Sequence, residues 1–182
     1  MAEIPYDCKF APHDLSQYSG LLLIGGGDVL PAFYNGSLSA KNVNFIRDKV
    51  ELDAIDYFYK NDLPIMGVCR GLQILNVYFG GSLKCVNSHS DNGADVCHSI
   101  IKVAEGRKFF NVISCHCQAI DAVAKNGKVI YLSPDNVVEE VDFSDKIFGV
   151  QFHPERSDGD VITEFYGKFA ALFNSSKNSP SP

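Results

Sequence analysis

The chain has 182 residues, which is about the length of one domain, and 46% of them are hydrophobic while 21% are charged. This composition excludes an intrinsically disordered chain. The net charge of −6, with no cluster of Lys or Arg, argues against nucleic acid or an anionic membrane as the main partner. The apolar runs are too short to span a bilayer. Glu3 and Asp7 occupy the region where a secretion signal needs Lys and apolar residues, so we expect a cytoplasmic protein whose six cysteines stay thiols.

The first half of the sequence alternates between buried strands and amphipathic helices. Residues 20–24 form an apolar run that ends in three glycines, which predicts a buried strand followed by a tight loop. Ser39 is expected to cap a helix, and residues 64–68 predict a second buried strand. The first helix has apolar residues spaced three and four apart, at Val43, Ile46, Val50, Ala54 and Tyr57. The helix after the second strand has an apolar face of Leu72, Leu75, Tyr78 and Phe79, and Gly80-Gly81 is expected to end it.

The second half is richer in strands. The segments with strand character are 99–103, 111–114, 128–132, 137–143 and 147–152. A last helix over 159–173 places Ile162, Phe165, Phe169 and Leu172 on one face. The pattern predicts a single α/β domain over residues 1–182 with an appended β region, and a flexible tail from about 174 to 182.

The candidate nucleophile is Cys69, which stands between a predicted buried strand and a predicted helix. Gly67 and Gly71 lie two residues before and two residues after it. A sharp strand-to-helix turn forces its central residue into a strained conformation, and flanking glycines remove the Cβ atoms that would clash. We expect an exposed thiol at a helix N-terminus, whose partial positive charge favours the thiolate. The N–H of Arg70 is then free to donate to an oxyanion.

A thiolate nucleophile needs a base, and the base needs a group that orients it. His153-Pro154-Glu155 follows the last predicted strand. Residues two apart on an extended segment point the same way, and Pro154 keeps His153 extended. We therefore expect His153 to face the thiol while Glu155 holds its other ring nitrogen.

The glycine-rich loop Gly25-Gly26-Gly27 lacks the spacing of a phosphate-binding loop and has no Lys after it. Two interpretations remain open: an ordinary turn, or a loop whose N–H groups, that of Gly26 in particular, complete an oxyanion hole with Arg70.

Two other kinds of site compete with the nucleophile. Several thiols and imidazoles could suggest a metal site, at Cys85, His89, Cys97, His98, Cys115, His116 and Cys117. No CxxC or HxxxH pair occurs among them, so we expect no metal. A redox role for Cys115-His116-Cys117 is disfavoured because the CxxC spacing is absent.

Taken together and in order, these motifs resemble class I glutamine amidotransferase-like proteins, in particular the peptidase C26 branch that contains γ-glutamyl-γ-aminobutyrate hydrolase. The resemblance runs from about residue 16 to residue 173. It implies a flavodoxin-like, mostly parallel sheet flanked by helices, a catalytic triad of Cys69, His153 and Glu155, and no cofactor. It also implies substrate contacts near Gln73, Ser114, His116 and Gln118.

The resemblance further implies a hydrolase that cleaves γ-glutamyl amides to glutamate and an amine. The alternative is a glutaminase subunit that delivers ammonia to a synthase partner; a binding module that has lost catalysis is disfavoured by the intact triad. Arg70 favours the hydrolase, and we expect its side chain to line the pocket mouth and meet an acidic leaving group. A small-molecule substrate is the expected partner, and a homodimer is compatible with the sequence.

The chain departs from the family pattern in two places. Family members carry a longer segment before the glycine-rich loop, whereas 24 residues precede Gly25 here, so an N-terminal strand of the family fold is expected to be missing. The family's Asn-Ser before the loop histidine reads Ile113-Ser114, which removes one polar substrate contact and predicts a changed specificity.

Overall fold

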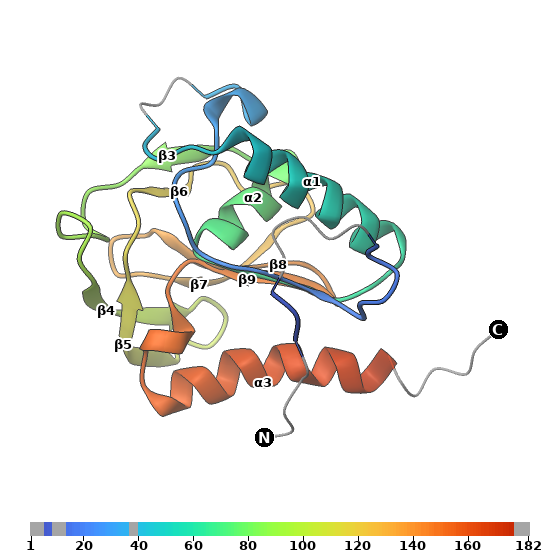
Figure 1. The fold of residues 1–182 in the computed structure, drawn as a ribbon. Helices are drawn as coiled ribbons and strands as arrows, with labels where there is room; N and C mark the ends of the chain where they lie inside the picture. Colours follow the sequence, from blue (N-terminus) through green and yellow to red (C-terminus); the bar gives the residue numbers. More distant parts are fainter. Residues whose placement is uncertain (1–5, 9–13, 37–39, 177–182) are drawn as a thin grey trace.

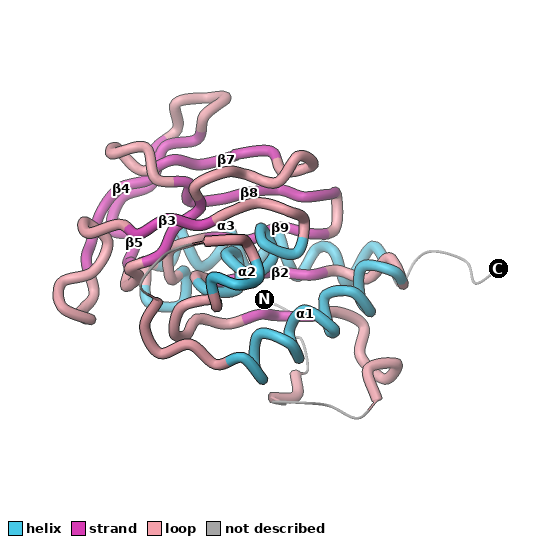
Figure 2. The backbone as a smooth tube through the Cα atoms, turned by 90° about the horizontal axis from the view of Figure 1, so that it is seen from above, coloured by secondary structure: helices cyan, strands magenta, loops and turns pink. Residues whose placement is uncertain are grey.

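The computed structural model describes residues 6–8, 14–36 and 40–176. It shows one large sheet with α1 (Phe45–Lys60) and α2 (Arg70–Tyr78) on one face and α3 (Gly159–Ser176) on the other (Figures 1 and 2). This three-layer arrangement confirms the predicted α/β fold. No helix within the described ranges is long and apolar enough to cross a membrane.

The large sheet has seven strands in the order β1-β2-β9-β8-β7-β4-β5. β1 pairs in parallel with β2, and β2 pairs in parallel with β9, while the four remaining pairings are antiparallel. The predicted β region is therefore a continuation of the same sheet, and the parallel pairing that the resemblance implies is confined to β1, β2 and β9. Its strands are β1 (Leu21–Leu23), β2 (Ile65–Val68), β4 (Val96–Lys102), β5 (Lys108–Ser114), β7 (Lys128–Leu132), β8 (Val138–Ser144) and β9 (Ile147–Val150).

A second, two-stranded antiparallel sheet joins β3 (Leu83–Cys85) to β6 (Gln118–Ile120). The sequence did not predict these three-residue strands, because such short segments carry too little periodicity to stand out. Two short 3-10 helices, η1 (Pro31–Phe33) and η2 (Pro154–Arg156), follow the glycine-rich loop and β9 respectively.

The start and the buried face of α1 differ from the prediction. Ser39, the predicted cap, lies outside the described residues, and the side chain of Asn44 caps the helix by accepting a hydrogen bond from the Arg47 N–H at 3.1 Å. Ile46 is 63% exposed, whereas the helix buries Asp48 together with Ala54, Ile55 and Phe58. The face of α1 that packs inward therefore includes the carboxylate of Asp48, and it differs from the face that the apolar spacing alone predicts.

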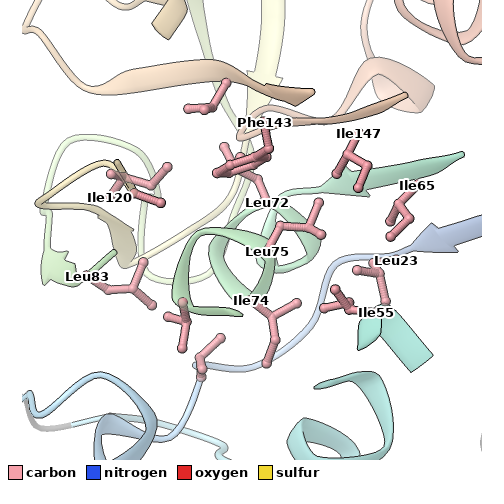
Figure 3. Packing of buried hydrophobic residues seen from close by; sticks show 14 of the residues in the cluster. Leu23, Ile55, Ile65, Leu72, Ile74, Leu75, Leu83, Ile120, Phe143 and Ile147 are labelled. Atoms are coloured by element: carbon pink, nitrogen blue, oxygen red, sulfur yellow. The ribbon is translucent and has the colours of Figure 1, made fainter. Parts of the chain in front are cut away.

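The other predicted helices are confirmed. The apolar face of α2 packs against the sheet, with Leu72, Ile74 and Leu75 at the centre of a core cluster that also contains Ile65 and Ile147 (Figure 3). A second cluster lies beneath the sheet, where Phe165 and Phe169 of α3 meet the strands. α3 continues to Ser176, so it includes the first residues of the predicted tail, and residues 177–182 lie outside the described part. Burial of each such side chain contributes about 1.5–3 kcal/mol.

β1 forms one edge of the large sheet. In the described segments before Leu21, residues 6–8 and 14–20, no residue is in a strand. Figure 2 shows α1 lying beside this edge. Because β1 and β2 are parallel, their carboxyl ends and the loops that follow them lie side by side at the same end of the strands.

Candidate active site

Cys69 occupies the turn between β2 and α2, as predicted. Its backbone is in a conformation with positive φ (φ 54°, ψ −109°), which non-glycine residues adopt at a cost of about 1–3 kcal/mol. A Cβ atom on Gly67 would lie 2.4 Å from the carbonyl carbon of Gly71, and one on Gly71 would lie 2.3 Å from the Leu23 oxygen. Both glycines are therefore required by close backbone approach, and the predicted elbow geometry is confirmed.

His153 and Glu155 form the hydrogen-bonded pair that the sequence predicts. His153 Nδ1 lies 2.6 Å from Glu155 Oε1, and because a carboxylate only accepts, Nδ1 carries the proton and Nε2 presents a lone pair. The His153 N–H donates to the Ile113 oxygen at 2.7 Å, which fixes the backbone beside β5. Partial burial is the largest single influence and acts to raise the pKa of Glu155, but the hydrogen bond from His153, a backbone hydrogen bond and the charges of His153 and Arg156 together outweigh it, and the pKa is lowered overall. Glu155 is thus held as a carboxylate that orients the imidazole.

The glycine-rich loop lies against both Cys69 and His153. A Cβ atom on Gly25 would be 3.7 Å from Cys69 Cβ, 3.0 Å from His153 Cε1 and 3.8 Å from His153 Nε2. The thiol, the imidazole and the loop therefore converge on one point. The Arg70 N–H hydrogen bonds to the Cys69 sulfur, which is where an oxyanion donor of an acyl-transfer site belongs.

The expected exposed thiolate is not what the structure shows. Cys69 is only 3% exposed, and burial raises its pKa to about 12, because the hydrogen bond from the Arg70 N–H offsets only part of the desolvation. The helix N-terminus does not overcome the loss of water around the sulfur. Cys69 is therefore a neutral thiol at rest, and a base must remove its proton as it reacts.

The side chain of Arg70 does not line the pocket mouth, which corrects the prediction. Its guanidinium is 3% exposed and makes ion pairs with Asp48 and Glu51 of α1. Arg70 is thus held toward the neighbouring helix, because the buried carboxylate of Asp48 and the half-buried carboxylate of Glu51 neutralise it. Asp48 and Glu51 lie one helical turn apart on α1, but their partner lies on a different element, so no local pattern indicated these ion pairs.

The same carboxylates connect α1 to the glycine-rich loop. Asp48 Oδ2 accepts from the Leu30 N–H at 3.0 Å. Arg47 donates to Glu51 at 2.7 Å and to the carbonyl oxygens of Ile24 and Gly25 at 3.0 Å each. Two arginines and two carboxylates therefore hold the elbow, α1 and the loop in one charged network.

The four predicted substrate contacts all lie in the interior with protein partners. Gln73 donates to the Gln118 carbonyl oxygen at 2.7 Å, and the Gln118 side chain accepts from the Val29 N–H at 3.0 Å. Ser114 Oγ lies 2.8 Å from His98 Nε2, and His116 Nδ1 lies 2.8 Å from the Gln118 oxygen. As they stand, these side chains brace the walls around the triad, and their substrate role stays a prediction.

Two of the histidines set aside as metal ligands for want of a CxxC or HxxxH spacing, His89 and His116, come together with Glu139, which the sequence did not indicate, in a group that could hold a metal. His89, His116 and Glu139 are all buried and place their ligand atoms within 4.8 Å of one another. They come from three separate segments, so no local spacing could have indicated the group. It lies outside the predicted triad.

Comparisons with known proteins show which family the chain resembles. A family model described as Peptidase C26 matches residues 4–155, a range that ends on Glu155. The chain is 32% identical over 169 residues to protein NtpR of Enterococcus hirae, covering 81% of this chain and 71% of that protein. A Schizosaccharomyces pombe protein is 34% identical over 155 residues, and the chain spans 61% of its length.

Two further relatives carry names that describe an activity. The chain is 28% identical over 151 residues to γ-glutamyl-CDP-amidate hydrolase of Campylobacter jejuni, covering 80% of this chain and 68% of that protein. It is 31% identical over 157 residues to GMP synthase (glutamine-hydrolyzing) of Helicobacter acinonychis, covering 84% of this chain but 27% of that protein. A solved glutamine amidotransferase of Thermotoga maritima shares the fold, with a TM-score of 0.60 at 20% identity over 92% of this chain and 69% of that one.

Removing one carboxylate from the charged network is expected to destabilise the fold. Asp48→Asn leaves the buried Arg70 guanidinium with one carboxylate in place of two, and we expect a loss of about 3 kcal/mol in the free energy of unfolding. Asp53→Asn on the same helix removes an exposed ion pair with Lys49, for which we expect a loss below about 1 kcal/mol. Urea denaturation of both variants measures the difference; equal losses would show that the network does not hold the site.

The buried thiol predicts a steep pH dependence of alkylation. Below its pKa a thiol gains thiolate about tenfold per pH unit, so the rate of Cys69 modification by iodoacetamide should climb tenfold per unit from about pH 7 to about pH 10. Peptide mass spectrometry measures this rate. In the urea-unfolded chain the rate should level off near about pH 9, because the burial is lost. A plateau below that pH in the folded protein would contradict a neutral resting thiol.

Proposed function

The chain belongs to the peptidase C26 family, and within it we propose a cysteine-dependent hydrolase that cleaves a γ-glutamyl amide through a γ-glutamyl thioester. The observation that carries the proposal is the convergence of the Cys69 elbow, the His153–Glu155 pair and the glycine-rich loop on one point. The name of the Campylobacter jejuni relative, a hydrolase of a γ-glutamyl amidate, supports the choice of substrate class.

The first half of the proposed reaction forms the thioester. Because Cys69 is a neutral thiol, His153 Nε2 takes its proton as the sulfur attacks the γ-carbonyl carbon. Glu155 holds Nδ1–H and stabilises the imidazolium that forms. The imidazolium then gives the proton to the nitrogen of the departing amine as the C–N bond breaks.

The negative charge on the carbonyl oxygen needs donors that are in place before the reaction. We assign the N–H of Arg70 and the N–H of Gly26 to this task. The Arg70 N–H already faces the Cys69 sulfur. Gly26 lies against the arginines, since a Cβ there would be 2.1 Å from Arg47 Nη1 and 3.3 Å from Arg70 Cδ.

The second half of the reaction consumes one water molecule. His153 removes a proton from the water, which adds to the thioester carbonyl. As the C–S bond breaks, the imidazolium gives that proton to the departing sulfur, which releases glutamate and restores the thiol. The bonds that form and break in both halves belong to the substrate, the side chains of Cys69 and His153, and one water molecule. We assign Gln73, Ser114, His116 and Gln118 to the binding wall for the glutamyl group, where a direct contact would require one of their present hydrogen bonds to open.

The experiment that tests this proposal measures hydrolysis of glutamine and a panel of γ-glutamyl amines by the purified chain. Cys69→Ser should abolish turnover. His153→Ala should lower kcat by about 10²–10⁴-fold because it removes the general base, and Glu155→Gln should cause a smaller loss because it only orients that base. Cys8→Ser, an exposed cysteine without an assigned role, is the matched control and should leave kcat/KM unchanged. Full turnover by Cys69→Ser would overturn the proposal.

One surface favours a second candidate, a glutaminase subunit that feeds a synthase. Ile24, which directly precedes the glycine-rich loop, is 55% exposed, and Phe45 and Ile46 at the start of α1 are 59% and 63% exposed. Arg47 joins these two segments through the Ile24 and Gly25 oxygens. An apolar surface beside the site suits a partner, and the likeness to a GMP synthase points the same way. Activity on γ-glutamyl amines without a partner supports the hydrolase, whereas glutaminase activity only after a synthase is added supports the subunit.

A further inference from the structure

A buried group of polar side chains lies outside the triad, and of its members only His116 has been assigned a role above, in the binding wall. His89 lies on the connection between β3 and β4, His116 lies between β5 and β6, and Glu139 lies in β8. Their exposed fractions are 2%, 6% and 0%. The backbone also joins two of these segments, since the His116 N–H donates to the His89 oxygen at 3.0 Å.

Each imidazole is oriented by a partner on its far side. His89 Nε2 lies 3.2 Å from both carboxylate oxygens of Asp135, which is itself held by Ser88 and Ser133. His116 Nδ1 lies 2.8 Å from the Gln118 carbonyl oxygen. Carboxylates and carbonyls accept hydrogen bonds, so these ring nitrogens carry the protons. The lone pairs are consequently on His89 Nδ1 and His116 Nε2, the two atoms that face Glu139.

The atoms at the centre of the group lack hydrogen-bond partners among the described residues. These atoms are His89 Nδ1, His116 Nε2 and both carboxylate oxygens of Glu139. His89 Nδ1 and Glu139 Oε1 are 3.5 Å apart, and His98 Nε2 lies 3.7 Å from the same oxygen. A buried polar atom without a partner costs about 1–3 kcal/mol, and more when it is charged. Four such atoms in one place imply that something binds between them.

A proton alone satisfies this group poorly. The ring nitrogens His89 Nδ1 and His116 Nε2 and both Glu139 oxygens are buried without partners. A single proton placed among them can be shared with only one of the two ring nitrogens. A metal cation can accept an electron pair from each of the three side chains at once, and so satisfies all of them.

We propose that His89 Nδ1, His116 Nε2 and Glu139 bind a divalent transition-metal ion of the Zn²⁺ type. Two neutral imidazoles and a carboxylate are a common zinc ligand set, with metal–ligand distances of about 2.0–2.2 Å. Ligand atoms in such a site are about 3.4 Å apart, so the group needs only a small contraction from its present spacing. Asp135 and the Gln118 carbonyl supply the outer hydrogen bonds that orient metal-binding histidines. His98 or a water molecule is in reach of the fourth position.

The metal would join three segments beside the active site and has no part in the hydrolysis. It would hold His116 and, through its hydrogen bond, Gln118, which anchors the backbone after the glycine-rich loop at Val29. Its role is therefore structural, and the test is metal content rather than activity.

The test adds Zn²⁺ alone to EDTA-treated, purified full chain and measures, by elemental mass spectrometry after gel filtration, how much stays bound. We expect one Zn²⁺ per chain in the wild type and in Cys69→Ser, and its loss in Glu139→Gln. Asp135→Asn, which keeps all three ligands, should weaken binding about 10–100-fold. Glu140→Gln is the matched control, because Glu140 is the next residue of β8, equally buried, but bonded to Lys168. It should retain the metal.

Three results would overturn the proposal: no Zn²⁺ retained by the wild type at micromolar concentration, equal retention by Glu139→Gln, or loss of the metal in Cys69→Ser, which would place it on the thiol. If Glu139→Gln fails to fold by circular dichroism, the graded loss in Asp135→Asn decides. Replacement by Co²⁺ adds a second readout, since imidazole and carboxylate ligands give visible absorption bands without the thiolate-to-metal band of a cysteine site.

Discussion

The buried ion pairs of Arg70 with Asp48 and Glu51 hold the active site together. Arg70 is the residue directly after the nucleophile, so its backbone N–H faces the reacting atoms while its side chain is fixed to α1. The same carboxylates hold Leu30 and Arg47, and Arg47 holds the glycine-rich loop. One charged network therefore sets the position of both assigned oxyanion donors relative to the thiol. A network of this kind contributes geometry more than stability, since buried charges give back much of their attraction as desolvation.

The neutral state of Cys69 shapes the chemistry that this geometry allows. Burial protects the thiol from oxidants and from other electrophiles, because only the thiolate reacts readily. In the proposed reaction proton removal must therefore accompany attack on the substrate, and this task falls to the His153–Glu155 pair. The low pKa of Glu155 keeps it ionised for this task over the physiological range. Thiol, base and orienting carboxylate thus act as one unit.

Much of this architecture could be predicted from the sequence because the relevant signals are local. The glycines on either side of Cys69 indicate a tight turn in which neighbouring backbone segments leave no room for a Cβ atom. The contact between His153 and Glu155 is likewise indicated by three consecutive residues. The strands of the second half stood out through their β-branched and aromatic residues. These features depend on neighbours in the chain, and the structure confirms them.

The parts that the sequence did not predict depend on contacts between distant segments. The side chain of Arg70 was expected at the pocket mouth but forms ion pairs in the interior. The sequence could not indicate this because its partners, Asp48 and Glu51, lie on another helix. For the same reason α1 buries a carboxylate where the apolar pattern favoured Ile46. The group of His89, His116 and Glu139 joins three elements, and a search for short metal motifs passes over it.

Trapping the reaction intermediate tests whether Cys69 carries the γ-glutamyl group during turnover. The chain is mixed with a γ-glutamyl anilide, the reaction is quenched in acid within the first turnover, and the peptides are analysed by mass spectrometry. We predict a γ-glutamyl adduct on the peptide that contains Cys69, and its absence in the His153→Ala variant. An adduct on a different cysteine, or turnover of the anilide without any adduct on Cys69, would contradict the account.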